Sequence, residues 1–93
     1  MSAIVLYITS VNPSQETKKN HQKIKMILDR KKIKCEDIDI AQSTDAKQKM
    51  RDIVGDPKAL PPQICNGETY CGDYAAFDNA VEAEDIESFL KLK

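Results

Sequence analysis

The chain has 93 residues, of which 31% are charged and 41% hydrophobic, and its formal net charge is −1. A chain of this length buries only roughly 60 to 65% of its unfolded surface, so we expect one domain over residues 1–93 and no second core. The near-neutral charge excludes the strongly basic surface that binding to nucleic acid or to an anionic membrane requires.

The cysteine content argues against a disulfide framework and against a metal site. Cys35, Cys65 and Cys71 are odd in number and form no C-x-x-C pair, and His21 is the only histidine. In a reducing compartment such cysteines are free thiols. The first residues, MSAIVLYITS, offer only about six consecutive apolar positions and no basic residue, too few for a signal peptide or a membrane span. We therefore expect no metal, no cofactor and a cytoplasmic location that can extend to the nucleus.

The first forty residues predict a β-α-β unit. Ala3 to Thr9 is an unbroken run of apolar and β-branched residues, typical of a central strand covered on both faces. The stretch SVNPSQ indicates a helix start, with Asn12 as the cap and Pro13 as the first helical residue. An amphipathic pattern then continues to about Lys31. Ile33 to Ile40 is predicted to be a second strand, parallel to the first.

A second helix follows, for which Ser43 or Thr44 is the predicted cap and Gly55 the predicted end. Its apolar positions repeat at helical spacing. The segment DPKALPP after it, residues 56–62, is predicted to be extended.

The last third of the chain predicts a hairpin and two helices. Asn66-Gly67 is a strong turn signal, because both residues tolerate positive φ, and it joins strands predicted at Pro62 to Cys65 and Thr69 to Cys71. Gly72-Asp73 is predicted to open a third helix and Asp85 a fourth.

The resulting order, β-α-β-α-β-β-α-α, resembles the thioredoxin fold in its smallest, glutaredoxin-like form: an α/β domain with a four-stranded mixed sheet flanked by helices. In proteins of that fold a cis proline precedes the third strand and faces the amino end of the first helix, and in LPPQIC this position is Pro62. A cis bond before proline costs only about 0.5 to 1 kcal/mol. The resemblance implies that the backbone ahead of Pro62 is free to bond an extended peptide or a glutathione-like ligand. The alternative is two trans prolines that merely stop the second helix.

Four stretches, VLYITSVNPS, GDPKALPPQICNG, YCGDYAAFDNAV and SFLKLK, resemble the Src homology 3 domain-binding glutamic-acid-rich-like family, a group of small glutaredoxin-related proteins. The likeness spans essentially the whole chain, and its most specific part is PPQICNGETYCGDYAAF. It is greatest to the short members, which consist of the bare domain, so we expect no glutamate-rich tail. Src homology 3 ligands carry prolines three apart, a spacing that Pro57, Pro61 and Pro62 lack. Weak or no binding to such domains is expected.

Glutaredoxin chemistry needs a thiolate at the amino end of the first helix, where the helix dipole lowers the pKa of a cysteine. If Pro13 aligns with the proline of the glutaredoxin motif, Asn12 replaces the nucleophile and Gln15 replaces the second cysteine. The serines nearby, Ser10 and Ser14, have no base beside them. The residues therefore predict a protein without catalytic residues and without disulfide exchange.

Cys71 permits two interpretations, a redox-sensitive or glutathionylated thiol close to the groove, and a packed or inert thiol. Glutaredoxins bind the glutamyl end of glutathione with a Gly-Gly pair and an acidic residue. Here Cys71 replaces the first glycine, and the acidic position falls on Asp73 or on Tyr74. Any glutathione binding is therefore expected to be weak, and Asp73 is first explained as a helix cap.

These features together predict a monomeric, non-enzymatic protein-interaction or regulatory module that modulates redox partners. The expected partner groove combines Asn12 and Pro13 with the segment Leu60, Pro61, Pro62 and with Gly72 and Asp73. Its protein partners are not identified by the sequence. Two alternatives remain, a glutathione-dependent redox protein that uses Cys71 and a glutathione binder without turnover.

Overall fold

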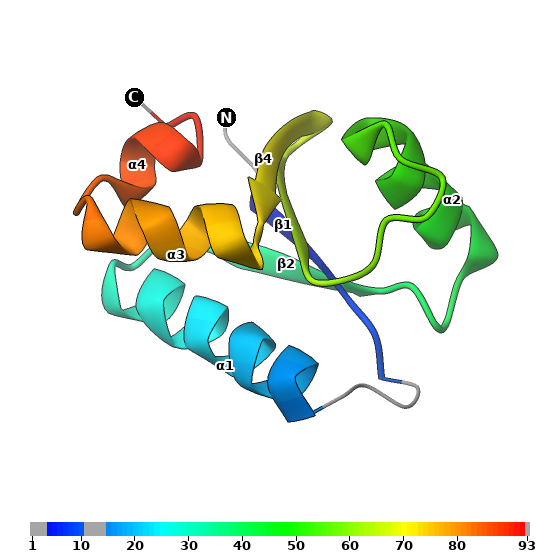
Figure 1. The fold of residues 1–93 in the computed structure, drawn as a ribbon, viewed down its shortest axis with the longest axis horizontal. Coiled ribbons are helices and arrows are strands. Elements are labelled where there is room, and N and C mark those ends of the chain that lie inside the picture. The colour runs from blue at the N-terminus through cyan, green and yellow to red at the C-terminus, as the bar shows by residue number, and fades with distance from the viewer. Residues whose placement is uncertain (1–3, 11–14, 93) are drawn as a thin grey trace.

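The computed structural model describes residues 4–10 and 15–92 of the chain (Figure 1). The elements in chain order are β1 (Ile4–Ile8), α1 (Gln15–Arg30), β2 (Cys35–Asp39), α2 (Thr44–Val54), β3 (Gln63–Asn66), β4 (Thr69–Asp73), α3 (Tyr74–Glu82) and α4 (Ile86–Phe89). This is the predicted β-α-β-α-β-β-α-α order of a small thioredoxin-like fold. Among the described residues, no helix is both long and apolar enough to cross a membrane.

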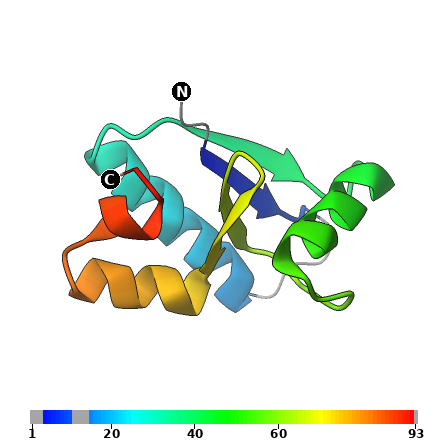
Figure 2. The same ribbon diagram turned by 90° about the horizontal axis from the view of Figure 1, so that it is seen from above.

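The four strands form one mixed sheet in the order β2-β1-β3-β4. β1 is central, parallel to β2 and antiparallel to β3, and β3 and β4 form the predicted antiparallel hairpin. Its turn lies at Gly67-Glu68 and not at the predicted Asn66-Gly67, because Asn66 is the last residue of β3 and pairs with Thr69. Figures 1 and 2 show α1 and α3 side by side on one side of the sheet and α2 apart from them. Because β2 and β4 are the outer strands in this order, they form the two edges of the sheet.

β1 is buried on both faces, which explains its unbroken apolar sequence. Ile4 and Leu6 belong to a core cluster with residues of α1, α3 and α4, whereas Val5 and Tyr7 belong to a second cluster that includes Met50 of α2. Successive side chains of a strand point to opposite faces, so one strand supplies both clusters. Each fully buried large apolar side chain contributes about 1.5 to 3 kcal/mol to stability.

Several element ends differ from the sequence prediction. The strand predicted at Ile33 to Ile40 begins only at Cys35, because the Ile33 N–H donates to the carbonyl of Leu28 (2.9 Å). β4 continues two residues further than predicted, to Asp73. The predicted start of the first helix, at Asn12 and Pro13, lies outside the described residues.

The ends of α2 follow the capping rules. The Ser43 hydroxyl accepts a hydrogen bond from the N–H of Ala46 (3.2 Å), so Ser43 is the cap and Thr44 the first helical residue. Gly55 ends the helix with φ at 81°, a left-handed conformation that glycine adopts readily. The prediction for this helix is confirmed.

The prediction that residues 56–62 are extended is wrong for the first part of the segment. The Asp56 carboxylate accepts the N–H of Lys58 (2.9 Å), and the Asp56 carbonyl accepts the N–H of Ala59 (3.1 Å). An aspartate side chain that bonds its own backbone two residues on is a strong turn former, a signal that the sequence interpretation missed. The turn buries Ala59 and leaves Leu60 exposed.

Gly72 allows two helices to approach the sheet. A Cβ atom at this position would lie 2.8 Å from Cβ of Ala76 and 2.8 Å from Cε1 of Phe89. Phe89 in turn packs edge-on against Phe77, with ring centroids 5.9 Å apart. Only a residue without a side chain lets α3 and α4 close on β4 at this point.

We predict that Gly72→Ala lowers the free energy of unfolding by about 3 kcal/mol, because the methyl group must displace side chains of the first core cluster. Equilibrium urea unfolding measures this loss. Gly67→Ala is the matched control. Gly72 and Gly67 both have positive φ (63° at Gly67), but nothing lies within 4 Å of the place that the methyl group at position 67 would take. Its cost should stay near about 1 kcal/mol. Equal losses in the two variants would contradict the packing role of Gly72.

Candidate functional site

The peptide bond between Pro61 and Pro62 is cis, as predicted. Pro62 lies next to the end of β1 and the first half of α1, because together with Ile8, Thr9, Thr17, Lys18 and His21 it lines a small hollow. The predicted juxtaposition of Pro62 and the first helix is thus present. The two other predicted groove residues of this region, Asn12 and Pro13, lie outside the described residues.

The hollow beside Pro62 is too small for a ligand. The described residues leave it a volume of about 30 Å³, which is about the space that one water molecule occupies in the liquid. Pockets for small molecules and cofactors measure about 300 to 1,000 Å³. This part of the groove, as residues 4–10 and 15–92 form it, is a nearly closed surface.

Leu60 projects from the same turn and, with 69% of its surface accessible, is the more exposed of the two large hydrophobic residues that lie open to solvent within residues 4–10 and 15–92. Its backbone is fixed from inside the protein. The Gln63 side chain, which is 7% exposed, donates from Nε2 to the Leu60 carbonyl (2.7 Å). The Tyr70 hydroxyl donates to the Gln63 Oε1 (2.8 Å). Hydrogen bonds from Tyr70 of β4 through Gln63 of β3 therefore hold the backbone carbonyl of the exposed leucine.

The hydrogen bond from Gln63 occupies part of the backbone that was predicted to be free ahead of Pro62. The Leu60 carbonyl already accepts a hydrogen bond from Gln63, and Pro61 has no N–H to donate. An extended peptide that adds to a sheet or a turn needs both donors and acceptors from the backbone. At this turn the Leu60 side chain is exposed, whereas one of its backbone acceptors is already engaged.

Gly72 and Asp73 lie beside the start of β3, since Gly72 is opposite Ile64 and Asp73 is opposite Gln63. Both have structural roles. The Asp73 carboxylate accepts the N–H of Ala76 (3.0 Å), which confirms the predicted cap of α3. Gly72 is the contact point for α3 and α4 described above.

Cys71 is half-buried in β4 and packs against the first core cluster. Burial raises the pKa of its thiol, and Lys91 opposes that change. It is not among the described residues that line the hollow at Pro62. The surroundings of Cys71 thus favour the protonated thiol, which is the less reactive form.

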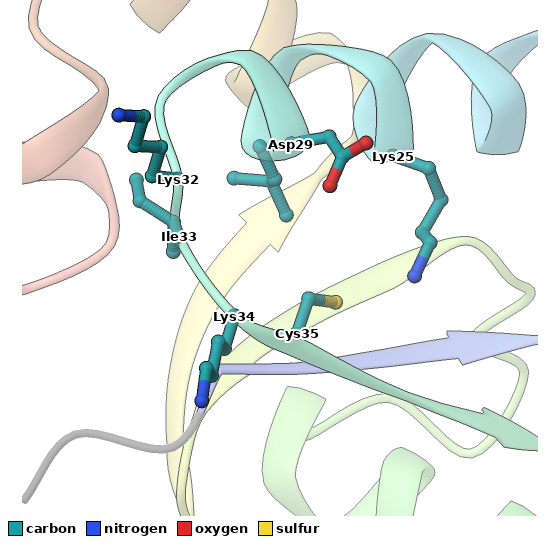
Figure 3. Close-up of a pocket in the computed structure, with 7 residues that line it drawn as sticks. Lys25, Asp29, Lys32, Ile33, Lys34 and Cys35 are labelled. Carbon is teal, nitrogen blue, oxygen red and sulfur yellow. The ribbon is translucent and has the colours of Figure 1, made fainter.

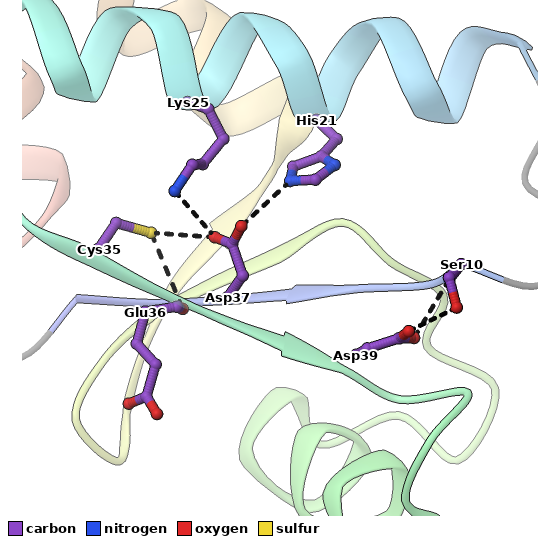
Figure 4. Close-up of polar contacts among 7 residues, drawn as sticks. All are labelled: Ser10, His21, Lys25, Cys35, Glu36, Asp37 and Asp39. Carbon is purple, nitrogen blue, oxygen red and sulfur yellow. Dashed lines mark hydrogen bonds and ion pairs between the residues drawn. The ribbon is translucent and has the colours of Figure 1, made fainter.

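A polar cluster between α1 and β2 was not predicted (Figure 4). The Asp37 carboxylate lies 3.2 Å from the Lys25 Nζ, 3.7 Å from the His21 Nε2 and 3.9 Å from the Cys35 Sγ. His21 and Lys25 are four residues apart on the helix and Cys35 and Asp37 two apart on the strand, so each pair shares a face. The sequence spacing places the two residues of each pair on one face of their element. Only the packing of α1 on β2 brings the two pairs together.

This cluster does not activate its cysteine. Burial, and then the negative charge of Asp37, raise the pKa of the Cys35 thiol to about 11. Burial likewise raises the pKa of Cys65 to about 11, and that residue is fully buried in the second core cluster. All three cysteines are free thiols, and their surroundings keep each one protonated near neutral pH. Among the described residues no group of three or more His, Cys, Asp or Glu side chains could bind a metal ion.

The fold matches solved structures of proteins with very different sequences. Actin interacting protein Aip5 of C. albicans superimposes with a TM-score of 0.81 at 16% identity, over 99% of this chain and 91% of that chain. Wild-type actin interacting protein 5 gives a TM-score of 0.77 at 14% identity, over 99% and 93% of the two chains. At these identities the likeness concerns the fold alone.

The sequence matches more specifically. The SH3 domain-binding glutamic acid-rich protein homolog of Drosophila melanogaster is 39% identical over 99 residues, which cover 94% of this chain. The alignment covers 63% of that relative, so the chain spans less than two thirds of its length. The sequence profile of the SH3-binding, glutamic acid-rich protein family matches residues 2–93. The chain therefore belongs to the SH3-binding, glutamic acid-rich protein family.

Proposed function

We propose that the chain is a non-enzymatic protein-interaction module that binds its partner through Leu60 and the surface around Pro62, and that it modulates redox partners in the cytoplasm and nucleus. One observation carries this proposal: a leucine with 69% of its surface exposed has its backbone carbonyl held by a hydrogen bond from the buried Gln63 side chain, which Tyr70 holds in turn. A backbone that is already held in place loses less conformational entropy on binding. Apolar anchors of this kind dominate the energetics of many interfaces.

The names of related proteins support a protein partner. The Drosophila relative is named for binding SH3 domains, and the structural neighbours are named for interacting with actin. Pro57, Pro61 and Pro62 lack the spacing of an SH3 ligand, and Pro62 is buried. We therefore assign recognition to Leu60 and not to the prolines.

A Leu60→Asp variant tests this assignment. The variant and the wild-type domain are each immobilised by the carboxyl terminus and exposed to cell extract. We predict that the variant captures at least about tenfold less of the partner proteins, because a carboxylate cannot enter an apolar pocket. Quantitative mass spectrometry of the captured proteins is the measurement. Met26→Asp is the matched control, since Met26 is the other large hydrophobic residue that is exposed (53%) in the described part of the chain, and it lies on α1. Loss of the same proteins in both variants, or in neither, refutes a docking role for Leu60.

The absence of thiol catalysis rests on the raised pKa values of the cysteines. In a variant that retains only Cys35, through Cys65→Ala and Cys71→Ala, the rate of alkylation by iodoacetamide should rise about tenfold per pH unit between about pH 7 and pH 10. The reason is that a thiol with a pKa of about 11 gains thiolate over this whole range. A rate that levels off below about pH 8 would show an activated cysteine instead.

The alternative, a glutathione-dependent redox protein, requires Cys71 to turn over. We predict that in a glutathione-coupled disulfide reductase assay the protein is no faster than its variant with Cys35, Cys65 and Cys71 all replaced by alanine. Turnover that exceeds this control and disappears in Cys71→Ser would establish the alternative. Turnover that survives Cys71→Ser would instead point to another thiol.

A further inference from the structure

The small net charge of the chain hides an uneven distribution. Residues 15–34 form α1 and the loop that leads to β2, and they contain eight of the 14 basic residues but only two of the 15 acidic ones. This segment therefore has a formal charge of +6, and the rest of the chain has −7. Charges of one sign on a single helix and loop produce a local positive potential that attracts acidic groups.

Ion pairs within the described chain offset only part of this charge. Three of the eight basic residues form ion pairs of 2.9 to 3.5 Å with acidic residues of other elements: Lys23 with Asp78, Lys25 with Asp37 and Lys31 with Glu87. The other five are exposed and form no ion pair within 4.0 Å with another residue that the structure describes: Lys18, Lys19, Arg30, Lys32 and Lys34. Three of these five lie within residues 30–34, at the end of α1 and in the loop after it.

A hollow lies between this loop, the end of α1 and the start of β2 (Figure 3). The described residues leave it a volume of about 540 Å³, within the range of ligand pockets, about 300 to 1,000 Å³. Three of its lining residues are apolar. Leu28 is almost fully buried, and Ile33 and Cys35 are half-buried and pack against the first core cluster. The hollow therefore offers an apolar surface that an aliphatic side chain can cover.

The charged residues that line the hollow are arranged unevenly. Lys32 and Lys34 belong to the loop, and Figure 3 shows both side chains extending outward from it. Lys25 and Asp29 belong to the last two turns of α1. Since Asp37 already offsets the charge of Lys25, the helix side of the hollow contributes a negative charge and the loop side two positive ones.

This arrangement selects the chemistry of a ligand. An apolar side chain fits the surface that Leu28, Ile33 and Cys35 form, and carboxylates beside it fit the loop side, where Lys32 and Lys34 lie. A long polyanion such as nucleic acid, or an anionic membrane, would extend beyond residues 15–34 and meet the negatively charged rest of the chain. A short acidic peptide covers the basic end alone.

We propose that the hollow at the end of α1 binds a short acidic peptide segment of another protein. One apolar side chain of the segment enters the hollow, and the neighbouring carboxylates form ion pairs with Lys32 and Lys34. Exposed ion pairs are individually weak, so the dissociation constant should be on the order of 0.1 mM. None of the residues that line the hollow belongs to the turn at Leu60, so this surface is a second one.

The probe is the peptide EELEE with acetylated and amidated ends, added to isotope-labelled protein in an NMR titration. We expect saturable shifts of the backbone amide signals of Leu28, Ile33 and Cys35, which line the hollow. Two control peptides separate the two parts of recognition, because QQLQQ lacks the charges and EEAEE lacks the large apolar side chain. Each should bind at least about fivefold more weakly. An EEAEE peptide that binds as well as EELEE overturns the proposal, because the attraction would then be purely electrostatic.

The double variant Lys32→Glu/Lys34→Glu should bind EELEE about tenfold more weakly, because the carboxylates then meet like charges. Lys47→Glu/Lys58→Glu is the matched control. It changes the net charge equally, and both lysines are exposed and lie on α2 and in the loop after it. This control should bind EELEE as the wild-type protein does. Equal weakening in the two double variants would show a general effect of net charge and overturn the proposal.

Asp29→Asn tests the same placement through a gain of affinity. Removing the negative charge on the helix side should tighten the binding of EELEE about threefold. A damaged fold cannot explain a tighter complex. An affinity that is unchanged or weaker would contradict the position of the carboxylates beside the hollow.

Cys35 reports whether the hollow itself is occupied, because its thiol is part of the lining. In a variant with Cys65→Ala and Cys71→Ala, saturating EELEE should slow the alkylation of Cys35 by iodoacetamide about fivefold. A peptide that binds without protecting Cys35 lies elsewhere, which would refute the proposal. Because the hollow does not include the turn at Leu60, Leu60→Asp should leave both measurements unchanged, so this proposal and the proposed function can fail separately.

Discussion

The structure depends on the burial of β1 on both faces. Leu6 and Tyr7, neighbours in sequence, are almost fully buried in two different core clusters, one with α1, α3 and α4 and one with α2. A domain of this size has little apolar surface to bury, so a strand that supplies side chains to both layers is central to its stability. Its pairing with β2 and β3 then sets where the turn at Pro62 and the edge at β2 lie.

The same construction explains how a thioredoxin-like fold can serve binding without thiol chemistry. The peptide bond before Pro62 is cis and Pro62 lies beside the first half of α1, but the described residues leave only a small hollow between them. The cysteines lie on β2, β3 and β4, where burial raises the pKa of each thiol. Meanwhile Gln63 and Tyr70 fix an exposed Leu60. Under the proposed function, the turn would act through this apolar side chain and not through a reactive sulfur.

The two proposed surfaces lie at different places in the fold. The Leu60 turn lies ahead of β3, whereas the hollow beside Lys32 and Lys34 lies at the end of α1, ahead of β2. In the sheet, β1 separates these two strands.

The sequence by itself determined the order of the elements, the central strand, the cap at Asp73 and the proline turn at Pro62, because these depend on local periodicity, capping and backbone restriction. The absence of a cysteine in SVNPSQ could also be counted there. Only the tertiary structure decided that Gln63 occupies the carbonyl of Leu60, that Asp37 joins His21 and Lys25, and that Gly72 is a contact point. These contacts join residues from different elements, and their distances depend on how helices pack on the sheet, which no local pattern specifies.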